Sequence, residues 1–325
     1  MAAPAPPPPG DGPIMVIDIG GTNVKLGFVD ASGPHLYGRL FATERLRAGD
    51  PVAVLAGFVS AAAGDTGLTP SAIVATVPGF VDADFDRVLS AANVPSLNGR
   101  ALASELGSAV GCPVYLERDA VLALAGEIAA GCARGADHVL GIFFGTGIGA
   151  AYVSGGAPFR GGGWALEIGH MPFRGEGRRL EGLRTDAIEA YCSGRVLRNL
   201  AARHGIEVAD VFPAARRTGA LAAELADFVR DQAFAVATAV ALFSPATVVL
   251  GGGVLDMDGY PRDRLLALID AHAPAAETVR RLDVRWSEHG WLSALHGARR
   301  VVAERSRPPT AAAPDEMPEG RPGGA

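Results

Sequence analysis

The stretch from Glu167 to Gly194 carries residue types that can bind either a metal ion or a sugar. Glu167 and His170 are three residues apart, and Glu189 follows a segment rich in arginine and glycine. Carboxylates and imidazoles are common metal ligands, but convergent polar groups of this kind also bind the hydroxyls of a small molecule. Taken singly, each is more often an ordinary surface or turn residue, and His170 a structural histidine. The spacing indicates the edge of an active site and leaves a metal site open.

Asp119 is the candidate for proton transfer. It follows the short apolar run Val114–Leu116 and precedes a helical pattern, so its carboxylate can project from the start of a helix into a cleft. A carboxylate within reach of a hydroxyl can accept its proton during phosphoryl transfer. The same position fits an ordinary helix N-cap, and the spacing alone favours neither interpretation.

Three glycine turns could bring backbone N–H groups close to phosphates. They are Asp18–Thr22 (DIGGT), Gly145–Gly149 (GTGIG) and Gly251–Gly253, the last between a strand and an expected helix. Each turn alone is better explained as a tight turn between elements, but the three together favour phosphate binding, and the third suits the base or ribose of a nucleotide. The chain has no Walker A motif and no strand–GxGxxG–helix unit, which argues against P-loop and Rossmann folds.

These turns predict the residues of a nucleotide site. Asp18, at the end of an apolar run, could hold Mg²⁺ through water. A side chain added at Gly147 is expected to weaken nucleotide binding more than sugar binding, by blocking the phosphates and by disfavouring a positive φ. The predicted phosphate- and nucleotide-binding residues are Asp18, Gly20, Gly21, Thr22, Gly145, Thr146, Gly147, Gly149, Gly251, Gly252 and Gly253.

The elements that must position these residues are expected to occur twice. A strand, a glycine turn and a second strand are predicted at Ile14–Asp30 and again at Val139–Val153. The sequence therefore predicts two similar α/β halves with a cleft between them. Further strands are expected at His35–Thr43, Ala72–Gly79, Val114–Leu116, Thr247–Val254 and Asp283–Trp286. Helices are expected at Pro51–Ala63, from Asp119 onward, and at Thr185–His204, Gly219–Phe243 and Leu292–Glu304.

Composition narrows the class of protein. The 325 residues carry a net charge of −6, so no broad basic surface is available, and neither nucleic acid nor membrane is an expected partner. No uninterrupted apolar run of about 18 residues suggests a membrane span. The three cysteines are too few and too scattered for a disulfide framework or a zinc cluster, which fits a cytoplasmic protein.

Proline-rich ends bracket the predicted domains. Residues 1–12 are expected to be a disordered leader, not a signal peptide, and residues 307–325 a disordered tail. Between them we expect an N-terminal domain at 13–120 and a C-terminal domain at 121–306, with the last helix able to pack back on the N-terminal domain.

With these motifs in view, the chain resembles the ROK family of sugar kinases, part of the actin/hexokinase superfamily. The resemblance rests on DIGGT, GTGIG and VVLGGGV in that order, with matching residues between them, and it covers nearly the whole folded part. It implies two actin-like (ribonuclease H-like) α/β domains with a central cleft, ATP and Mg²⁺ as cosubstrate and cofactor, and phosphorylation of a free hexose at O6. It also implies that Asp119 is the base and that the sugar pocket is lined by Gly79, Asn93, Arg118, Asp119, Glu167, His170 and Glu189.

The chain departs from the family pattern near the acceptor site in two single residues and in the ligands of a metal. Arg118 and Leu166 stand where the family usually has asparagine and glycine. In the family, the counterpart of His170 and three cysteines bind a structural zinc, but the cysteine positions here read Leu180, Gly182 and Ala187. Zinc is therefore predicted to be absent. The loop would instead be held by packing or ion pairs, with Leu180, Leu183, Ile188, Glu176, Arg178, Arg179 and Glu181 as candidates.

Several motifs are more similar to the D-allose kinases than to the glucokinases. They are Arg118-Asp119, Gly155–Phe159, Cys192–Gly194 and Gly251–Arg262. The alternatives are a glucokinase or another ROK hexose kinase, and a kinase-dead sugar-sensing regulator. ROK repressors carry a DNA-binding segment before the first glycine turn, whereas only 17 residues, rich in proline, precede Asp18 here. A homodimer is the assembly considered.

Overall fold

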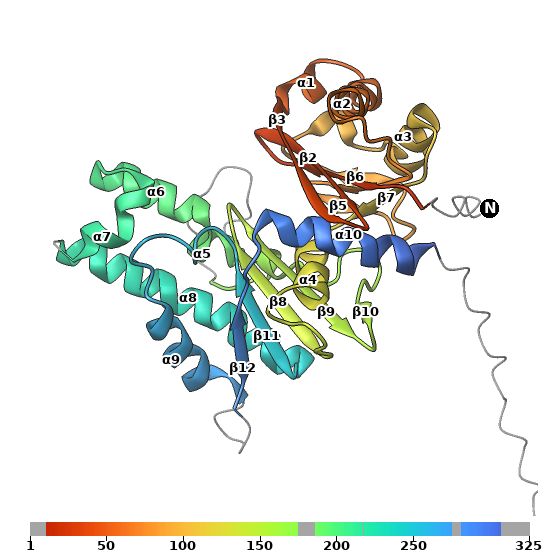
Figure 1. Cartoon of the computed structure of the whole chain (residues 1–325). Coiled ribbons are helices and arrows are strands. Elements are labelled where there is room, and N and C mark those ends of the chain that lie inside the picture. Colours follow the sequence, from red (N-terminus) through yellow and green to blue (C-terminus); the bar gives the residue numbers. More distant parts are fainter. Residues whose placement is uncertain (1–10, 175–185, 217, 275–280, 307–325) are drawn as a thin grey trace, which may run out of the picture.

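The computed structural model describes residues 11–174, 186–216, 218–274 and 281–306. They form two α/β halves, each built on a five-stranded sheet (Figure 1). The first sheet has the order β3-β2-β1-β4-β7. Its strands are β1 (Ile14–Ile19), β2 (Asn23–Asp30), β3 (Gly33–Ala42), β4 (Ala72–Thr76) and β7 (Val114–Glu117).

The second sheet repeats this plan. Its order is β10-β9-β8-β11-β12, and in both sheets an antiparallel hairpin is followed by two parallel strands. The repeat agrees with the prediction of two similar halves, each opening on a glycine turn. The strands are β8 (Val139–Phe144), β9 (Ile148–Ser154), β10 (Ala157–Pro158), β11 (Thr247–Gly251) and β12 (Asp283–Trp286).

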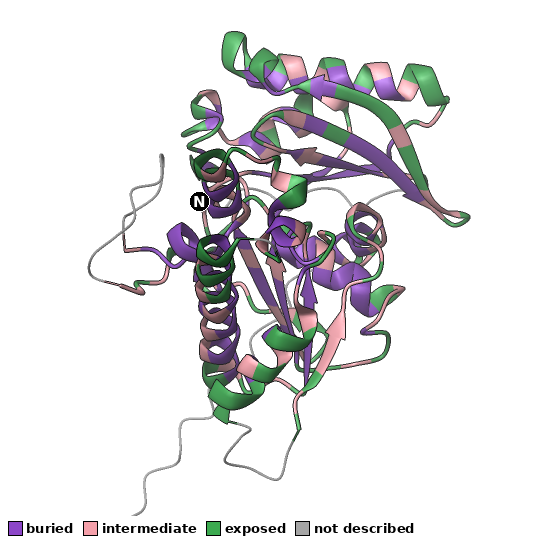
Figure 2. Ribbon diagram, turned by 90° about the vertical axis from the view of Figure 1, so that its left-hand side faces the viewer, coloured by how far each residue is buried: buried purple, intermediate pink, exposed green. Residues whose placement is uncertain are grey.

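Helices cover both sheets, and buried residues follow the sheet strands and the inner faces of the helices (Figure 2). On the first half lie α1 (Glu44–Ala48), α2 (Pro51–Thr66), α3 (Leu102–Val110), the hairpin β5 (Phe80–Val81) and β6 (Val88–Ser90), and the 3₁₀ turn η1 (Pro95–Leu97). The second half holds η2 (Ile168–His170), α5 (Glu189–Cys192), α6 (Gly194–His204), η3 (Val208–Asp210), α7 (Val211–Ala215), α8 (Gly219–Phe243) and α9 (Arg262–His272).

Local sequence explains where α2 begins and ends. The Asp50 side chain accepts a hydrogen bond from the Ala53 N–H at 3.0 Å, and Pro51 occupies the first turn, where its missing N–H costs nothing. Gly67 ends the helix with φ 70°, a left-handed conformation that favours glycine. The buried face of the helix, including Leu55 and Phe58, joins the core of the first sheet.

Two helices pack between the halves, α4 (Asp119–Ala129) and α10 (Trp291–Arg305) (Figure 1). Helix α10 shares a core with the first sheet, whereas α4 shares one with the second. The two helices approach closely because Gly126 and Gly297 leave no side chain at the contact. A Cβ at Gly126 would lie 1.8 Å from the Ser293 carbonyl oxygen. The last helix thus packs on the N-terminal sheet, and the domain boundary at residue 120 remains a prediction.

Several expected elements differ in extent. The helix predicted at Thr185–His204 is broken: α5 ends at Cys192, Ser193 is extended, and α6 begins at Gly194, while residue 185 lies outside the described part. The helix expected directly after Gly253 begins only at Arg262. The strand expected at Ala72–Gly79 ends at Thr76, where the chain leaves the sheet toward β5. Within the described ranges, no helix is both long and apolar enough to cross a membrane.

Candidate active site

The first glycine turn places Asp18 at the end of β1, beside the other half of the molecule. The Thr76 hydroxyl donates to Asp18 Oδ1 at 2.8 Å, and the Lys25 ammonium lies 3.9 Å from Oδ2. Burial raises the pKa of Asp18, and the negative charge of Asp119 adds to this rise. The turn itself is closed by the Gly20 N–H, which donates to the Asn23 carbonyl at 3.0 Å, leaving Gly21 and Thr22 exposed.

Arg47, which no sequence pattern pointed to, joins this turn to the predicted sugar residue Asn93. From α1 its Nε donates to the Asn93 carbonyl at 2.8 Å, and its Nη2 donates to the Gly21 carbonyl at 2.7 Å. A Cβ built on Gly21 would lie 3.5 Å from the Asn93 side chain. The first glycine turn and the Asn93 loop are therefore direct neighbours.

Asp119 is an exposed carboxylate at the start of α4. It is the first residue of the helix, and the N-cap position belongs to Arg118, whose side chain makes no capping bond. Asp119 is therefore not the N-cap that the spacing left open. Its charge acts on both Asp18 and Glu167, so carboxylates from both halves converge on this residue. An exposed carboxylate in such a place can take a proton from a bound hydroxyl.

Glu167 and His170 lie at the two ends of η2, and Glu167 lies near Asp119. Burial raises the pKa of Glu167, while Arg118 lowers it with an ion pair of 3.0 Å between Nε and Oε1. His170 is exposed, and its ring lies 5.3 Å from that of Phe80 in the other half. Gly79, next to Phe80, has no room for a side chain, because a Cβ would lie 1.9 Å from the Ser90 carbonyl oxygen.

Glu189 connects the second glycine turn to the Glu167 segment. Its Oε2 accepts a hydrogen bond from the Ile148 N–H at 2.9 Å, and the residue is only 9% exposed. Cβ atoms built on Gly147 and Gly169 would lie 2.5 Å and 2.8 Å from the same oxygen. Both glycines are thus required for the close approach of this carboxylate.

Arg118, which is also among the predicted sugar residues, has its guanidinium bound to other protein groups. It is 8% exposed, and all three guanidinium nitrogens contact protein atoms. Besides the ion pair with Glu167, Nη2 donates to the Ala150 carbonyl at 2.8 Å and Nη1 donates to the Ala165 carbonyl.

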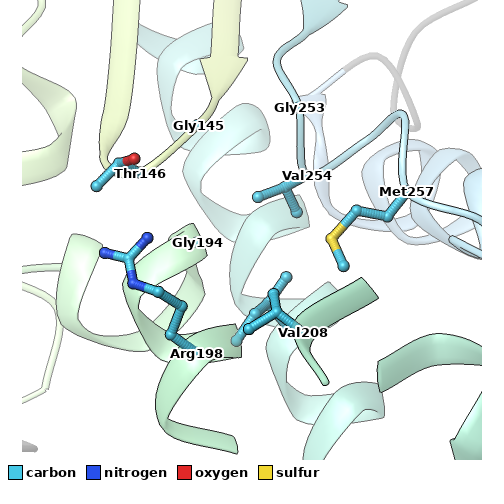
Figure 3. A pocket seen from close by; sticks show the side chains of 9 residues that line it. Gly145, Thr146, Gly194, Arg198, Val208, Gly253, Val254 and Met257 are labelled. Atoms are coloured by element: carbon cyan, nitrogen blue, oxygen red, sulfur yellow. The ribbon is translucent and has the colours of Figure 1, made fainter. Parts of the chain in front are cut away.

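A pocket of about 290 Å³ lies between the second and third glycine turns (Figure 3). The Arg198 guanidinium lies on the Thr146 side of it, and apolar side chains form the opposite side. A mostly apolar pocket with a few polar groups suits the base of a nucleotide. The lining residues are Gly145, Thr146, Gly194, Leu197, Arg198, Val208, Gly253, Val254 and Met257.

Glycine geometry accounts for the close approach of the segments around this pocket. Gly252 has φ 98°, and a Cβ there would lie 2.4 Å from the Phe144 carbonyl oxygen. Gly194, which sequence analysis missed, donates its N–H to the Gly145 carbonyl at 2.8 Å, and a Cβ would lie 2.6 Å from that oxygen. The start of α6 can therefore pack directly against the second glycine turn.

The structure thus brings most predicted residues together in two neighbouring places. Asp18, Asp119, Glu167 and Glu189 are linked by mutual charge effects or by the second glycine turn, and Gly149 lies beside Asp119. Gly145, Thr146 and Gly253 line the apolar pocket. The pocket residues that the predicted nucleotide site did not include are Gly194, Leu197, Arg198, Val208, Val254 and Met257.

The segment that carries the zinc cysteines in the family is only partly described. Leu180 and Gly182 lie outside the described residues, as do Leu183 and the charged candidates Glu176, Arg178, Arg179 and Glu181. Ala187 is buried and forms a bridge with Pro172, and the Ile188 N–H donates to the Met171 carbonyl at 3.0 Å. Ile188 itself is in the core of the second half. Among the described residues, no group of three or more His, Cys, Asp or Glu side chains could hold a metal ion.

The chain is similar in sequence and in fold to several known proteins. A ROK family glucokinase from Streptomyces griseus, solved with glucose and AMPPNP, is 28% identical with a TM-score of 0.76, and the match covers 90% of this chain and 100% of that one. A β-glucoside kinase from Klebsiella pneumoniae is 28% identical over 267 residues, 76% of this chain and 84% of the relative. The chain spans about half (54%) of a bifunctional NanE/NanK enzyme from Brucella melitensis, at 29% identity over 294 residues.

These likenesses confirm the predicted fold of two actin-like α/β domains. The model of the ROK family matches residues 14–305, nearly all of the part that the structure describes. The protein therefore belongs to the ROK family.

Proposed function

We propose that this protein is an ATP-dependent hexose kinase in which Asp119 accepts the proton of the attacking hydroxyl. The observation that carries the proposal is the exposed Asp119 carboxylate, which stands beside Asp18 and Glu167 at the point where the two halves meet. The apolar pocket supplies a place for a nucleotide base on the far side of the second glycine turn.

The reaction would be a direct phosphoryl transfer. The hexose hydroxyl oxygen, O6 in our proposal, forms a bond to the γ-phosphorus of ATP, the bond from that phosphorus to the bridging oxygen of ADP breaks, and Asp119 takes the hydroxyl proton. Backbone N–H groups of the first two glycine turns would face the phosphates. Closure of the two halves would exclude water and limit ATP hydrolysis.

The residues around Asp18 fit a hydrated Mg²⁺. Its carboxylate is partly buried, and the neighbouring charge of Asp119 raises its pKa further. Carboxylate oxygens are the ligands that Mg²⁺ prefers, and a divalent cation would offset the negative charge that Asp119 places near Asp18. When bound, Mg²⁺ would neutralise charge on the phosphates, and Asp18 would hold it through water.

The sugar-binding assignments come from the family resemblance, and the positions of the residues support them. Glu167, His170 and Glu189 come from the C-terminal half, while Asn93 and the backbone near Gly79 come from the N-terminal half. Groups that approach a sugar from both sides can bind several hydroxyls at once and favour closure. We place the protein in the cytoplasm, and a homodimer is the assembly to be tested by light scattering.

D-allose is the hexose that we expect to give the highest kcat/KM, with glucose as the main alternative. The reason is the resemblance of Arg118-Asp119 and of Gly251–Arg262 to the D-allose kinases. A coupled assay of ADP release across a panel of aldohexoses tests this. A preference for glucose of about tenfold or more, about 1.4 kcal/mol in transition-state free energy, would reject the allose assignment and leave the kinase assignment intact. Hexose binding without ADP release from any sugar would instead indicate a sugar sensor.

The purified protein is expected to contain no stoichiometric zinc and to work without it. Of the family's four ligand positions only His170 keeps a metal-binding side chain, and the other three read Leu180, Gly182 and Ala187. Metal analysis after exhaustive dialysis is the direct measurement, with activity followed in excess Mg²⁺ and a zinc-selective chelator. About one zinc per chain, with activity lost on its removal, would contradict the prediction and mean that other residues have taken over the site.

A further inference from the structure

We propose that Arg118 is a positioning residue that holds Glu167 in place relative to Asp119, and that it governs hexose affinity without contacting the hexose. The inference rests on the proposed kinase function and adds a residue role to it. Arg118 directly precedes the proposed base, and its guanidinium contacts the residue that is proposed to bind sugar hydroxyls.

Each of the three guanidinium nitrogens contacts the second half of the molecule. Nε pairs with Glu167 at 3.0 Å, Nη2 donates to the Ala150 carbonyl of β9 at 2.8 Å, and Nη1 donates to the Ala165 carbonyl. The planar, rigid fork of an arginine can satisfy three such partners at once, which a lysine cannot. These contacts use three of the five N–H donors, and Arg118 is only 8% exposed, so burial leaves little access for a direct bidentate contact with a sugar.

The backbone between two of these contacts is strained. Leu166 has φ 61°, in the left-handed region where a residue with a branched side chain is uncommon, and it is 7% exposed. Arg118 binds the residues on both sides of Leu166, namely the carbonyl of Ala165 and the carboxylate of Glu167. The Arg118 side chain thus holds both neighbours of Leu166. A strained backbone conformation of this kind persists only where surrounding contacts maintain it.

Arg118 also affects the ionisation of Glu167, because its positive charge favours the carboxylate form. Glu167 is partly buried and stands near the negative charges of Asp119 and Glu189, all of which disfavour its ionised form. Arg118 is the largest of the influences that favour that form. Without it, Glu167 would lose the ion pair that orients it and the largest influence that favours its ionised form, the form that accepts two hydrogen bonds from sugar hydroxyls.

Arg118 is itself held firmly from the first half. Glu117 Oε1 accepts a hydrogen bond from the Arg118 N–H at 3.0 Å, and Glu117 Oε2 pairs with Arg160 at 2.6 Å. Arg160 also pairs with Glu304 of α10 at 2.6 Å. Because Glu117 and Arg118 are consecutive, this buried network fixes the point from which both the guanidinium and the Asp119 carboxylate project.

The test combines Arg118→Gln, Glu167→Gln and the double variant, with hexose binding followed by calorimetry and turnover by ADP release. We expect Arg118→Gln to raise the hexose KM and Kd about tenfold while the ATP KM changes less than about twofold. Glu167→Gln should weaken hexose binding as well. If Arg118 acts through Glu167, adding Arg118→Gln to Glu167→Gln costs much less than it does alone.

Two further variants extend the test, and the second of them, Arg118→Lys, keeps it decisive if Arg118→Gln folds poorly. Leu166→Gly removes the backbone strain, so it should restore part of the hexose affinity of Arg118→Gln. Arg118→Lys keeps the buried charge but loses the fork, so an intermediate hexose KM is expected. Arg285→Gln is the matched control, because Arg285 also binds a carboxylate (Asp283, 2.6 Å) and a carbonyl (Cys132, 2.8 Å), but on the edge strand β12. Its hexose KM should remain unchanged.

Distinct outcomes would overturn the proposal. An equal loss of hexose affinity from Arg118→Gln with and without Glu167→Gln would mean that Arg118 contacts the sugar independently. A lowered melting temperature with unchanged hexose KM would mean that its role is structural only. Failure of the kinase proposal is recognised separately, because the wild-type protein would then release no ADP with any hexose while the binding measurements could still be made.

Discussion

Asp119→Asn is expected to bind ATP and hexose nearly as well as the wild-type protein and to lose most of its turnover. The amide has the size of the carboxylate but cannot accept the hydroxyl proton. General-base assistance typically contributes about 10²–10⁴-fold to the rate. Because Asp119 is exposed and makes its one described hydrogen bond to the adjacent Ala120 N–H, the substitution should leave the fold intact. Turnover is measured by coupled ADP release, and binding by calorimetry with hexose and a non-hydrolysable ATP analogue.

Asp227→Asn provides the matched control for this variant. Asp227 lies on α8, its side chain is 50% exposed, and it pairs only with Arg230 among the described residues, at 2.9 Å. A surface pair of this kind contributes little, so activity should stay near the wild-type level. Turnover close to wild type in Asp119→Asn would exclude Asp119 as the base. Loss of hexose binding together with turnover would instead assign it a binding role.

The paired halves were predictable because their signals are local. A short apolar run, a glycine turn and a second apolar run specify a hairpin, and this pattern occurs at both β1–β2 and β8–β9. Helix α8 was predicted with its observed bounds, since a long periodic pattern ends at Phe243 and Ser244 takes a left-handed conformation.

The break between α5 and α6 could not be predicted, because it depends on a contact distant in sequence. Residues 189–204 read as one helix, yet Ser193 is extended and buried. The adjacent Gly194 N–H donates to the Gly145 carbonyl in the second glycine turn. A helix that continued through Ser193 would move Gly194 and could not make this contact. Tertiary packing thus overrides the local helical preference.

The candidate site likewise contains some residues that could be predicted from the sequence and others that could not. Glycines and carboxylates could be proposed as site residues from the sequence, because few other residue types can approach a phosphate closely or accept a proton. The pocket residues Leu197, Val208 and Met257 read as ordinary core positions, since apolar residues carry no sign of which ones face a ligand. Arg47 was missed because a single arginine in the short helix α1 says nothing about the two carbonyls that it binds.

Gly147→Val is expected to weaken both hexose and nucleotide binding, in contrast to the sequence-based prediction that nucleotide binding would suffer more. The structure corrects the physical reason. Gly147 is not among the glycines with positive φ, so backbone strain is not the issue. A Cβ at this position would lie 2.5 Å from Glu189 Oε2, which is shorter than the sum of the van der Waals radii of the two atoms.

Glu189 cannot simply swing away from such a side chain. Its Oε2 accepts the Ile148 N–H at 2.9 Å and lies against Gly169, next to His170, so displacement would disturb η2 as well as the second glycine turn. Overpacking a closed contact typically costs about 1–3 kcal/mol, which is about 5–150-fold in affinity when binding depends on the displaced group. We expect the hexose Kd to rise by that factor and the nucleotide Kd to rise too.

Gly145→Ala is the matched control that separates the two ligands. Gly145 lies in the same turn and lines the apolar pocket that we propose for the nucleotide, but a Cβ there would have no atom within 4 Å. Its added methyl group can interfere only with a ligand that approaches the turn, so nucleotide affinity should fall while hexose affinity is retained. Gly147→Ala should behave like Gly147→Val, because the Cβ itself makes the collision. If Gly147→Val weakened nucleotide binding alone, Glu189 would have to yield without moving His170, and this carboxylate would then not connect the phosphate turn to the sugar site.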